Sequence, residues 1–146
     1  MKQWISQSPE DTQRIGEELA RQLKPGDVVA MFGGLGMGKT AFVRGMAKGL
    51  EIDGAEVSSP TYAIVHEYNN GKIPLYHFDM YRVSTWEDLD SAGFFYYLSL
   101  RGIIAVEWSE NIEGALPEKQ VIDVTLTKGN KENERMITIS SAEDDI

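Results

Sequence analysis

Residues 30–40 read AMFGGLGMGKT, which contains the spacing G-x-x-x-x-G-K-T of a phosphate-binding P-loop. The motif consists of Gly33, Gly38, Lys39 and Thr40. Glycines adopt backbone conformations that a β-carbon would forbid, so successive N–H groups can turn toward phosphate oxygens. In such a loop the lysine reaches the β- and γ-phosphates, and the threonine hydroxyl binds Mg²⁺. This stretch therefore predicts a nucleotide-binding fold.

The segments beside the loop support this interpretation. Residues 27–32, DVVAMF, form a short apolar run typical of a buried parallel strand. Residues 40–50 predict a helix that ends near Gly49, and the positive end of its dipole would face the phosphates. The alternative is a chance glycine-rich turn. Here, however, the motif lies between a strand and a helix, where a P-loop belongs.

The N-terminal segment predicts a strand and a helix. Trp4 and Ile5 favour a short strand. Residues 8–23 predict a helix with Ser8 as N-cap and Pro9 at the first helical position, followed by a turn at residues 25–26.

The middle of the chain is rich in strand-like runs. Residues 61–81 hold two such runs around Asn69-Asn70-Gly71, which is a hairpin signal. Pro74 favours an edge position for the second run. Next, residues 84–93 predict a helix with Ser84 as cap and Glu87 at the capping-box spacing.

The C-terminal half alternates apolar and polar segments. Residues 94–100, FFYYLSL, predict a short buried helix, and residues 102–107 form an apolar run that ends in an acid. Residues 121–127 and 135–141 predict two strands joined by a polar turn, and residues 142–146 are expected to fray. With no repeat, linker or composition break, we expect one domain over residues 1–146. The expected fold class is α/β: a three-layer P-loop NTPase-like domain with a mixed sheet and a central β-hairpin.

Composition narrows the location and the partners. The chain has 146 residues and no cysteine, and it contains neither a signal-peptide pattern nor a long apolar run, so we expect a cytoplasmic protein without a membrane partner. Its 14 Lys plus Arg against 23 Asp plus Glu give a net charge of −9. Because tight nucleic-acid binding rests on neutralising phosphates, this chain is not expected to grip DNA or RNA alone.

Two acids are candidates for the chemistry beside the phosphates. A P-loop needs an acid at the end of a neighbouring strand to hold magnesium or orient water. Glu107 ends the apolar run GIIAVE, and Asp79 ends the more amphipathic run PLYHFD. For each, the alternative is an ordinary surface acid at the end of a strand.

Three other features have both a functional and a structural interpretation. Residues 58–62, SSPTY, lie where many P-loop proteins have a nucleotide-sensing switch, but a plain turn stiffened by proline is equally compatible with this stretch. His66 and His77 lack a metal-like spacing, so we expect histidines on the sheet surface. The aromatic run 94–97 favours core or partner surface over a base-stacking platform.

Rival classes of nucleotide-binding protein fit less well. A GTPase should carry Asn-Lys-x-Asp, whereas residues 130–133 read NKEN on a polar turn. A small-molecule kinase would need a lid with clustered arginines, and Arg44, Arg82 and Arg101 are scattered. ATP therefore ranks above GTP, and a small module acting on another protein ranks above a kinase.

Four motifs follow one another along the chain: GGLGMGKTAFVRG, SSPTYAIVHEY, YHFDMYR and AVEW. Together they resemble the bacterial TsaE (YjeE) family, the P-loop ATPases of the tRNA threonylcarbamoyladenosine modification pathway. The similarity runs from the first expected helix to the last expected strands. One departure is Gly34, where the family usually has an acid.

The resemblance implies ATP and Mg²⁺ as cofactors, with Thr40 and Glu107 on the metal and Asp79 contributing to hydrolysis. It also implies an adenine pocket near residues 9–12. The implied catalytic residues are Asp79, Glu107 and Lys39. The implied nucleotide-binding residues, all in or beside the motifs, are Gly33, Gly36, Met37, Gly38, Lys39, Thr40, Ala41, Thr61 and Trp108.

The resemblance also implies protein partners. These are the transferase TsaD, which modifies an adenosine next to the anticodon, and its companion TsaB. The implied role is an ATP-dependent reset or turnover factor for their complex. Because no arginine stands where the sequence would identify a finger, we expect ATPase activity that is weak alone and stimulated by partners. The alternative is a free-standing small-molecule kinase.

Overall fold

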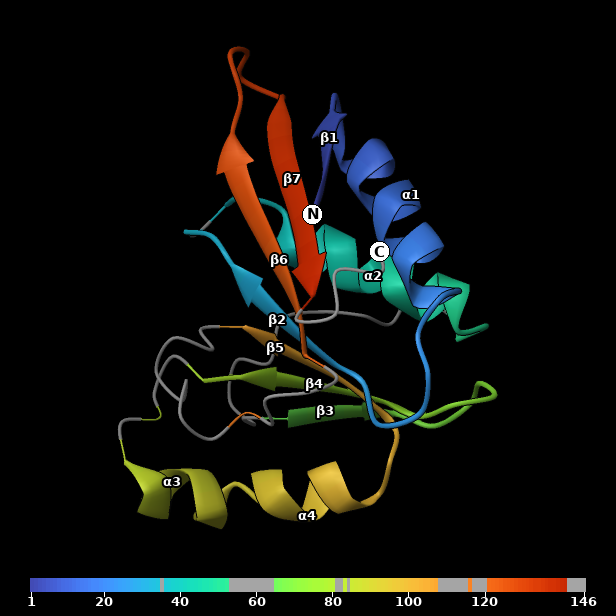
Figure 1. The fold of residues 1–146 in the computed structure, drawn as a ribbon, viewed down its shortest axis with the longest axis vertical. Helices are drawn as coiled ribbons and strands as arrows, with labels where there is room; N and C mark the ends of the chain where they lie inside the picture. The colour runs from blue at the N-terminus through green and yellow to red at the C-terminus, as the bar shows by residue number, and fades with distance from the viewer. Residues whose placement is uncertain are drawn as a thin grey trace.

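The computed structural model describes residues 1–34, 36–52, 65–80, 83, 85–107, 116 and 121–141. In this part of the chain, seven strands form one sheet in the order β1-β7-β6-β2-β5-β4-β3 (Figure 1). The strands are β1 (Lys2–Ser6), β2 (Val28–Phe32), β3 (Val65–Tyr68), β4 (Leu75–Asp79), β5 (Ile103–Glu107), β6 (Val121–Lys128) and β7 (Arg135–Ser141). The helices are α1 (Pro9–Ala20), α2 (Lys39–Gly49), α3 (Trp86–Ser91) and α4 (Phe94–Ser99).

The sheet is mixed, as predicted. β2 pairs in parallel with both β5 and β6, and β4 pairs in parallel with β5. The antiparallel pairs are β3 with β4, β6 with β7 and β1 with β7. The two predicted hairpins and the short N-terminal strand are therefore confirmed. The predicted frayed residues 142–146 lie outside the described part of the chain.

Helices cover both faces of the sheet, which gives the expected three layers (Figure 1). Side chains alternate between faces along a strand, and β5 follows this rule. Ile103 and Ala105 join the core that α1 and α2 cover, whereas Ile104 and Val106 join the core that includes Leu89 of α3 and Phe94 of α4. Because β5 is parallel and buried on both faces, its sequence reads as a continuous apolar run.

Helix α1 starts where its sequence predicts and packs closely on α2. The Ser8 side chain caps the helix by accepting a hydrogen bond from the Asp11 N–H at 3.1 Å. A β-carbon at Gly45 of α2 would overlap the backbone carbonyl of Gln13 in α1. Glycine at this position is therefore required by the close approach of the two backbones.

Three local predictions need correction. The edge position predicted for the second hairpin strand is wrong, because β4 lies between β3 and β5. Pro74 precedes the first residue of β4, so its missing N–H breaks no strand pairing, and its carbonyl accepts a hydrogen bond from the Ile103 N–H at 2.8 Å.

The cap of α3 is Thr85, not the predicted Ser84, which lies outside the described residues. The Thr85 hydroxyl accepts a hydrogen bond from the Asp88 N–H at 3.0 Å. The pair Thr85 and Asp88 has the same spacing as Ser84 and Glu87, so spacing alone could not choose between the two.

Helix α4 forms as predicted, but it is not a buried helix. Phe94 is fully buried, whereas Tyr96 is 64% exposed. No helix in the part of the chain that the structure describes combines the length and apolar character that crossing a membrane requires.

Candidate nucleotide-binding site

The loop between β2 and α2 has a backbone that only glycine adopts easily. Gly36 and Gly38 have φ angles of 78° and 103°, and Gly38 is the N-cap of α2. Gly33 faces β6 so closely that a β-carbon there would lie 2.7 Å from the Leu126 carbonyl oxygen. The loop therefore brings the N-terminal end of α2, which is the positive end of the helix dipole, to the edge of the sheet. Leu35, inside the loop, lies outside the described residues.

Lys39 begins α2 and is only 6% exposed. Its Nζ lies 4.0 Å from Glu107 Oε1, and the Glu107 side chain is 6% exposed. A buried ammonium and a buried carboxylate at this distance form an ion pair in a low-dielectric setting. The structure thus brings together two of the residues that the sequence singled out, 68 positions apart in the chain (107 − 39).

The carboxyl ends of the parallel strands bring Asp79 to the same edge. Asp79 in β4 is the register partner of Glu107 in β5, and Glu107 is in turn opposite Met31 in β2. Side chains at these positions point to the face that α1 and α2 cover, since Ala105, two residues earlier, packs there. Both candidate acids therefore lie on the P-loop face of the sheet.

His77 is the residue that sequence reasoning missed. Its side chain is fully buried, and its Nε2 lies 2.6 Å from Glu107 Oε2. The interpretation of His77 as a sheet-surface residue is wrong, because β4 is an inner strand whose P-loop face is covered. The available signal was the spacing of His77 and Asp79, which puts both on one face of a strand. His66, by contrast, is half-buried on the edge strand β3.

The carboxylate of Glu107 is therefore held from two sides. Oε1 faces the Lys39 ammonium, and Oε2 hydrogen-bonds the His77 ring. The other ring nitrogen of His77, Nδ1, is buried without a hydrogen-bond partner in the described structure. Because a carboxylate oxygen accepts hydrogen bonds, Nε2 is the donor in this contact.

Two residues from distant parts of the chain border the loop. Thr12 in α1 is 2% exposed, and its γ-methyl group would lie 3.7 Å from a β-carbon at Gly38. The start of α1, where the adenine pocket was expected, is thus beside the loop. Arg135 at the start of β7 donates a hydrogen bond from Nη2 to the Gly36 carbonyl at 3.3 Å. This contact could not be predicted from local sequence, because it joins residues 99 positions apart.

The donor set of this site fits a magnesium nucleotide. Mg²⁺ prefers oxygen ligands and is usually held by one or two protein groups together with phosphate oxygens and water. Thr40 lies in the first turn of α2 and Glu107 at the neighbouring strand end, so the two residues that would hold the metal supply a hydroxyl and a carboxylate. Within the described residues, no group of three or more His, Asp or Glu side chains could hold a metal without the nucleotide.

Comparisons with known proteins identify the family. The family model "Threonylcarbamoyl adenosine biosynthesis protein TsaE" matches residues 6–137. The chain belongs to the TsaE family. It is 41% identical over 140 residues to the "tRNA threonylcarbamoyladenosine biosynthesis protein TsaE" of Bacillus subtilis (strain 168), a match that covers 94% of this chain and 87% of the relative.

A second relative and a solved structure agree with this assignment. The protein of the same name from Treponema pallidum (strain Nichols) is 39% identical over 130 residues, with 88% of this chain and 95% of the relative covered. The "Crystal structure of Bacillus subtilus YdiB" superposes with a TM-score of 0.76 at 35% identity, and the match covers 96% of this chain and 84% of that one. The TsaE resemblance and the fold class inferred from the sequence are both confirmed.

Several TsaE-like positions lie outside the structure's described part. These are Thr61 in the SSPTY segment, Trp108 and Arg82. The remaining implied positions are placed: Met37 is half-buried against the core beneath α1 and α2, and Ala41 follows Thr40 in the first turn of α2. A β-carbon at Gly34 would meet nothing within 4 Å, so the acid that the family usually has there would be sterically tolerated.

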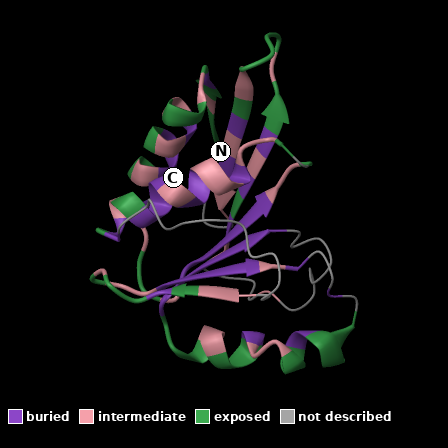
Figure 2. Cartoon of the chain, turned by 180° about the vertical axis from the view of Figure 1, so that it is seen from behind, coloured by how far each residue is buried: buried purple, intermediate pink, exposed green. Residues whose placement is uncertain are grey.

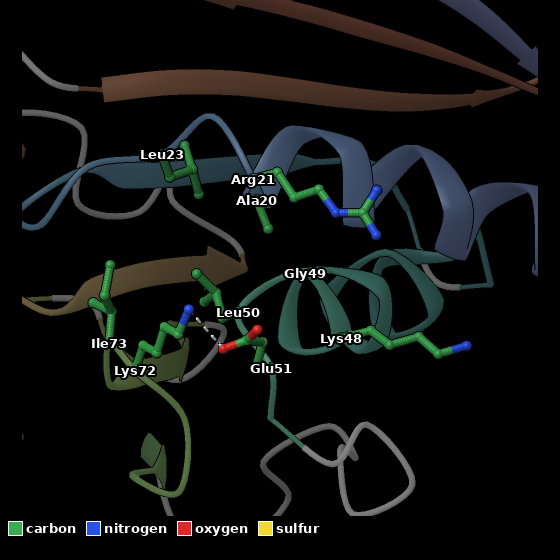
Figure 3. A pocket seen from close by; sticks show the side chains of 9 residues that line it. All are labelled: Ala20, Arg21, Leu23, Lys48, Gly49, Leu50, Glu51, Lys72 and Ile73. Carbon is green, nitrogen blue, oxygen red and sulfur yellow. Dashed lines mark ion pairs between the residues drawn. The ribbon is translucent and has the colours of Figure 1, made fainter.

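Another hollow of about 330 Å³ lies at the far end of α2 (Figure 3). It is lined by the ends of α1 and α2 and by the β3–β4 turn. The 11 residues of α2 correspond to about 16 Å, so this hollow is remote from Lys39. Lys72 turns toward Glu51 at 3.3 Å, while Lys48 extends away from that pair (Figure 3). The lysines that line this hollow therefore do not point to a common position (Figure 3), whereas Lys39 and His77 both contact Glu107.

Proposed function

We propose that this chain binds and hydrolyses ATP with Mg²⁺ as a subunit of the machinery that makes threonylcarbamoyladenosine in tRNA, acting on a complex of TsaB and TsaD. The observation that carries the proposal is the grouping of Lys39, Glu107 and Asp79 at the loop edge of the sheet. Membership of the TsaE family supplies the pathway, because its named relatives are tRNA threonylcarbamoyladenosine biosynthesis proteins.

The residues of the loop divide the work of binding. The N–H groups of residues 36–40 and the Lys39 ammonium would bind the phosphate oxygens. The Thr40 hydroxyl and the Glu107 carboxylate would hold Mg²⁺, which when bound neutralises charge on the β- and γ-phosphates. The hydrogen bond from His77 orients the Glu107 carboxylate for that task.

Asp79 is the proposed hydrolytic residue. It stands beside Glu107 in register and is half-buried, so it is less enclosed than Glu107. A carboxylate in this position can orient a water molecule and accept its proton as the bond to phosphorus forms. In this assignment Glu107 is a fixed ligand and Asp79 acts on the nucleophile.

The described surroundings of the loop support the expectation that the protein alone hydrolyses ATP slowly. An arginine that stabilises the transferring phosphoryl group is worth about 10³–10⁵ in rate. Arg135, the arginine whose contact with the loop the described structure records, uses its guanidinium on three backbone carbonyls: those of Glu132, Glu134 and Gly36. Its role is to brace the loop, and we propose that a partner supplies the missing stabilisation.

A free-standing kinase is the weaker candidate. Such an enzyme would need its own acceptor site and a lid with clustered arginines, and its relatives would be named for a metabolite. The relatives of this chain are instead named for tRNA modification. The net charge of −9 fits a subunit that contacts protein while TsaB and TsaD handle the tRNA.

Steady-state ATPase activity tests the proposal. The purified protein should hydrolyse ATP slowly, and addition of purified TsaB–TsaD should raise the rate. The Lys39→Ala variant should show neither basal nor stimulated activity above background. Full activity in isolation, or no change on adding the pair, would favour a free-standing enzyme.

A further inference from the structure

We propose that α3 and α4 form a docking surface for a protein partner that has an apolar centre and a basic rim. This α3–α4 surface consists of large exposed apolar side chains: Trp86 (62% exposed), Phe95 (37%), Tyr96 (64%) and Leu100 (42%). Exposed positions extend over much of both helices (Figure 2). The inference deepens the proposed function, on which its choice of partner rests.

The α3–α4 surface is held in place from beneath. Leu89 is 1% exposed and Phe94 is fully buried, and both belong to the core that includes Phe78 of β4. The rings of Phe78 and Phe94 meet edge to face with centroids 5.2 Å apart. These buried anchors fix both short helices on the sheet, so the outward side chains are presented by a supported framework.

The exposed rings also order one another. Trp86 of α3 and Phe95 of α4 stack with centroids 5.8 Å apart and an interplanar angle of 11°. Stacked rings lose little further conformational freedom when a partner covers them. Tryptophan and tyrosine are enriched among the residues that dominate binding energy at interfaces, because they bury a large area with few rotatable bonds.

Charge selects the class of partner. The exposed carboxylates on α3 are Glu87, Asp88 and Asp90. Residues 85–100 contain neither lysine nor arginine. Such a surface repels the phosphates of nucleic acid and of anionic lipid, and it would also repel a second copy of itself. A protein surface with lysines or arginines around an apolar centre is the complement.

The position of the surface links it to the nucleotide site. The Met80 N–H, directly after Asp79, donates to the Glu107 carbonyl at 2.9 Å, and the Val83 N–H donates to the Met80 carbonyl at 3.1 Å. Thr85 then caps α3. Helix α3 lies toward the end of the molecule to which β4 and β5 run (Figure 1). A partner docked here would lie on the face of the sheet opposite α1 and α2, toward the end of the sheet at which Asp79 and Glu107 stand (Figure 1).

Binding of purified TsaB–TsaD to substituted proteins tests the α3–α4 surface. A Trp86→Ser, Tyr96→Ser double variant removes the two most exposed rings, and we expect it to weaken the affinity about tenfold or more. A Glu87→Lys, Asp90→Lys variant should weaken binding as well, and the wild-type affinity should fall as salt rises. The matched controls are Ile5→Ser, an exposed apolar residue on edge strand β1, and Glu18→Lys on α1; both should bind like the wild type.

The outcomes separate the inference from the function on which it rests. Unchanged affinity of both surface variants, with wild-type binding intact, would overturn the docking surface and leave the proposed function standing. Failure of the wild-type protein to bind the pair would overturn both. A large drop in the unfolding midpoint of the double variant would show that these rings stabilise the chain itself, and this would contradict a docking surface. A wild-type dimer that the double variant abolishes would assign the surface to a second copy, which also contradicts the proposal.

Discussion

The Lys39 ammonium is buried, so we expect it to make a measurable contribution to ATP affinity. In Lys39→Ala the phosphates would lose their buried ammonium, and charge-assisted hydrogen bonds contribute about 1.5–3 kcal/mol. We expect ATP affinity to fall about 10- to 100-fold in calorimetric titration. Lys48→Ala removes the same charge at the exposed far end of α2 and should bind ATP normally. Equal affinity of the wild-type protein and Lys39→Ala would contradict the P-loop assignment.

Substitutions of Glu107 and Asp79 should affect different steps, ATP binding and ATP hydrolysis respectively. Glu107 is buried and held by Lys39 and His77, so Glu107→Ala should weaken the binding of ATP in the presence of Mg²⁺. Asp79 is half-buried and is proposed to act on the attacking water, so Asp79→Ala should bind ATP normally and lose hydrolysis. Calorimetry with and without Mg²⁺, followed by single-turnover hydrolysis, distinguishes the two. The reverse pattern would show that the roles are exchanged.

In the proposed function His77 is a positioning residue, because its ring contacts Glu107 and would act through that carboxylate. Loss of a hydrogen bond that orients a metal ligand typically costs about 10- to 100-fold in metal affinity. We therefore expect His77→Leu to raise the Mg²⁺ concentration needed for ATP binding while binding without Mg²⁺ is unchanged. His77→Gln, whose side-chain amide can still donate toward Glu107, should recover part of the Mg²⁺ dependence. A variant that loses metal-free binding to the same extent would indicate a purely structural role.

At the scale of elements, the contact between α1 and α2 leaves no room for a side chain at Gly45. A β-carbon at Gly45 would overlap the Gln13 backbone, so Gly45→Ala must push the helices apart. Overpacking of this kind costs about 1–3 kcal/mol, which should appear as a lower free energy of unfolding in urea. Gly34→Ala is the matched control, because its β-carbon would meet nothing within 4 Å. Comparable stability of the two variants would contradict the close packing of α1 on α2.

Elements with local signals could be predicted from the sequence. Around residues 28–49, an apolar run predicts the strand, glycines predict the loop and helical spacing predicts the helix. Both hairpins have polar turns. Pro74 and Thr85 show where local signals end. Whether β4 is an edge or an inner strand depends on β5, which is distant in sequence, and two adjacent residues could equally cap α3. The sequence therefore predicted which helices and strands form. It predicted less well which strands lie at the edge of the sheet and which side chains are buried.

The candidate site also divides into residues with local sequence signals and residues that are placed by distant contacts. Lys39, Thr40, Glu107 and Asp79 stand at recognisable positions in a loop or at the end of a strand, so their neighbourhood could be predicted. His77 and Arg135 could not be assigned, since their partners Glu107 and Gly36 are 30 and 99 positions away. Only the three-dimensional pairing of strands shows that one histidine lies beneath the carboxylate and that an arginine braces the loop.

At the scale of the molecule, the chain has two features: the buried pair of Lys39 and Glu107 at the loop edge of the sheet, and the exposed aromatic α3–α4 surface. The acidic net charge of −9 disfavours direct binding of tRNA, so in the proposed function the effect on tRNA passes through proteins that hold it. In the proposed account, ATP binding and hydrolysis at the loop edge are coupled to TsaB–TsaD through a surface that begins close to Asp79 in the chain. Coupling of this kind requires that the partner bind one nucleotide state better than the other.

The most direct test is the formation of threonylcarbamoyladenosine in tRNA by purified TsaB–TsaD supplied with a threonylcarbamoyl donor. The account predicts that this protein with ATP raises the number of tRNA molecules modified per transferase complex. Lys39→Ala, or a non-hydrolysable ATP analogue, should not produce this increase. Equal product with the wild-type protein, with Lys39→Ala and with no added protein would contradict the account.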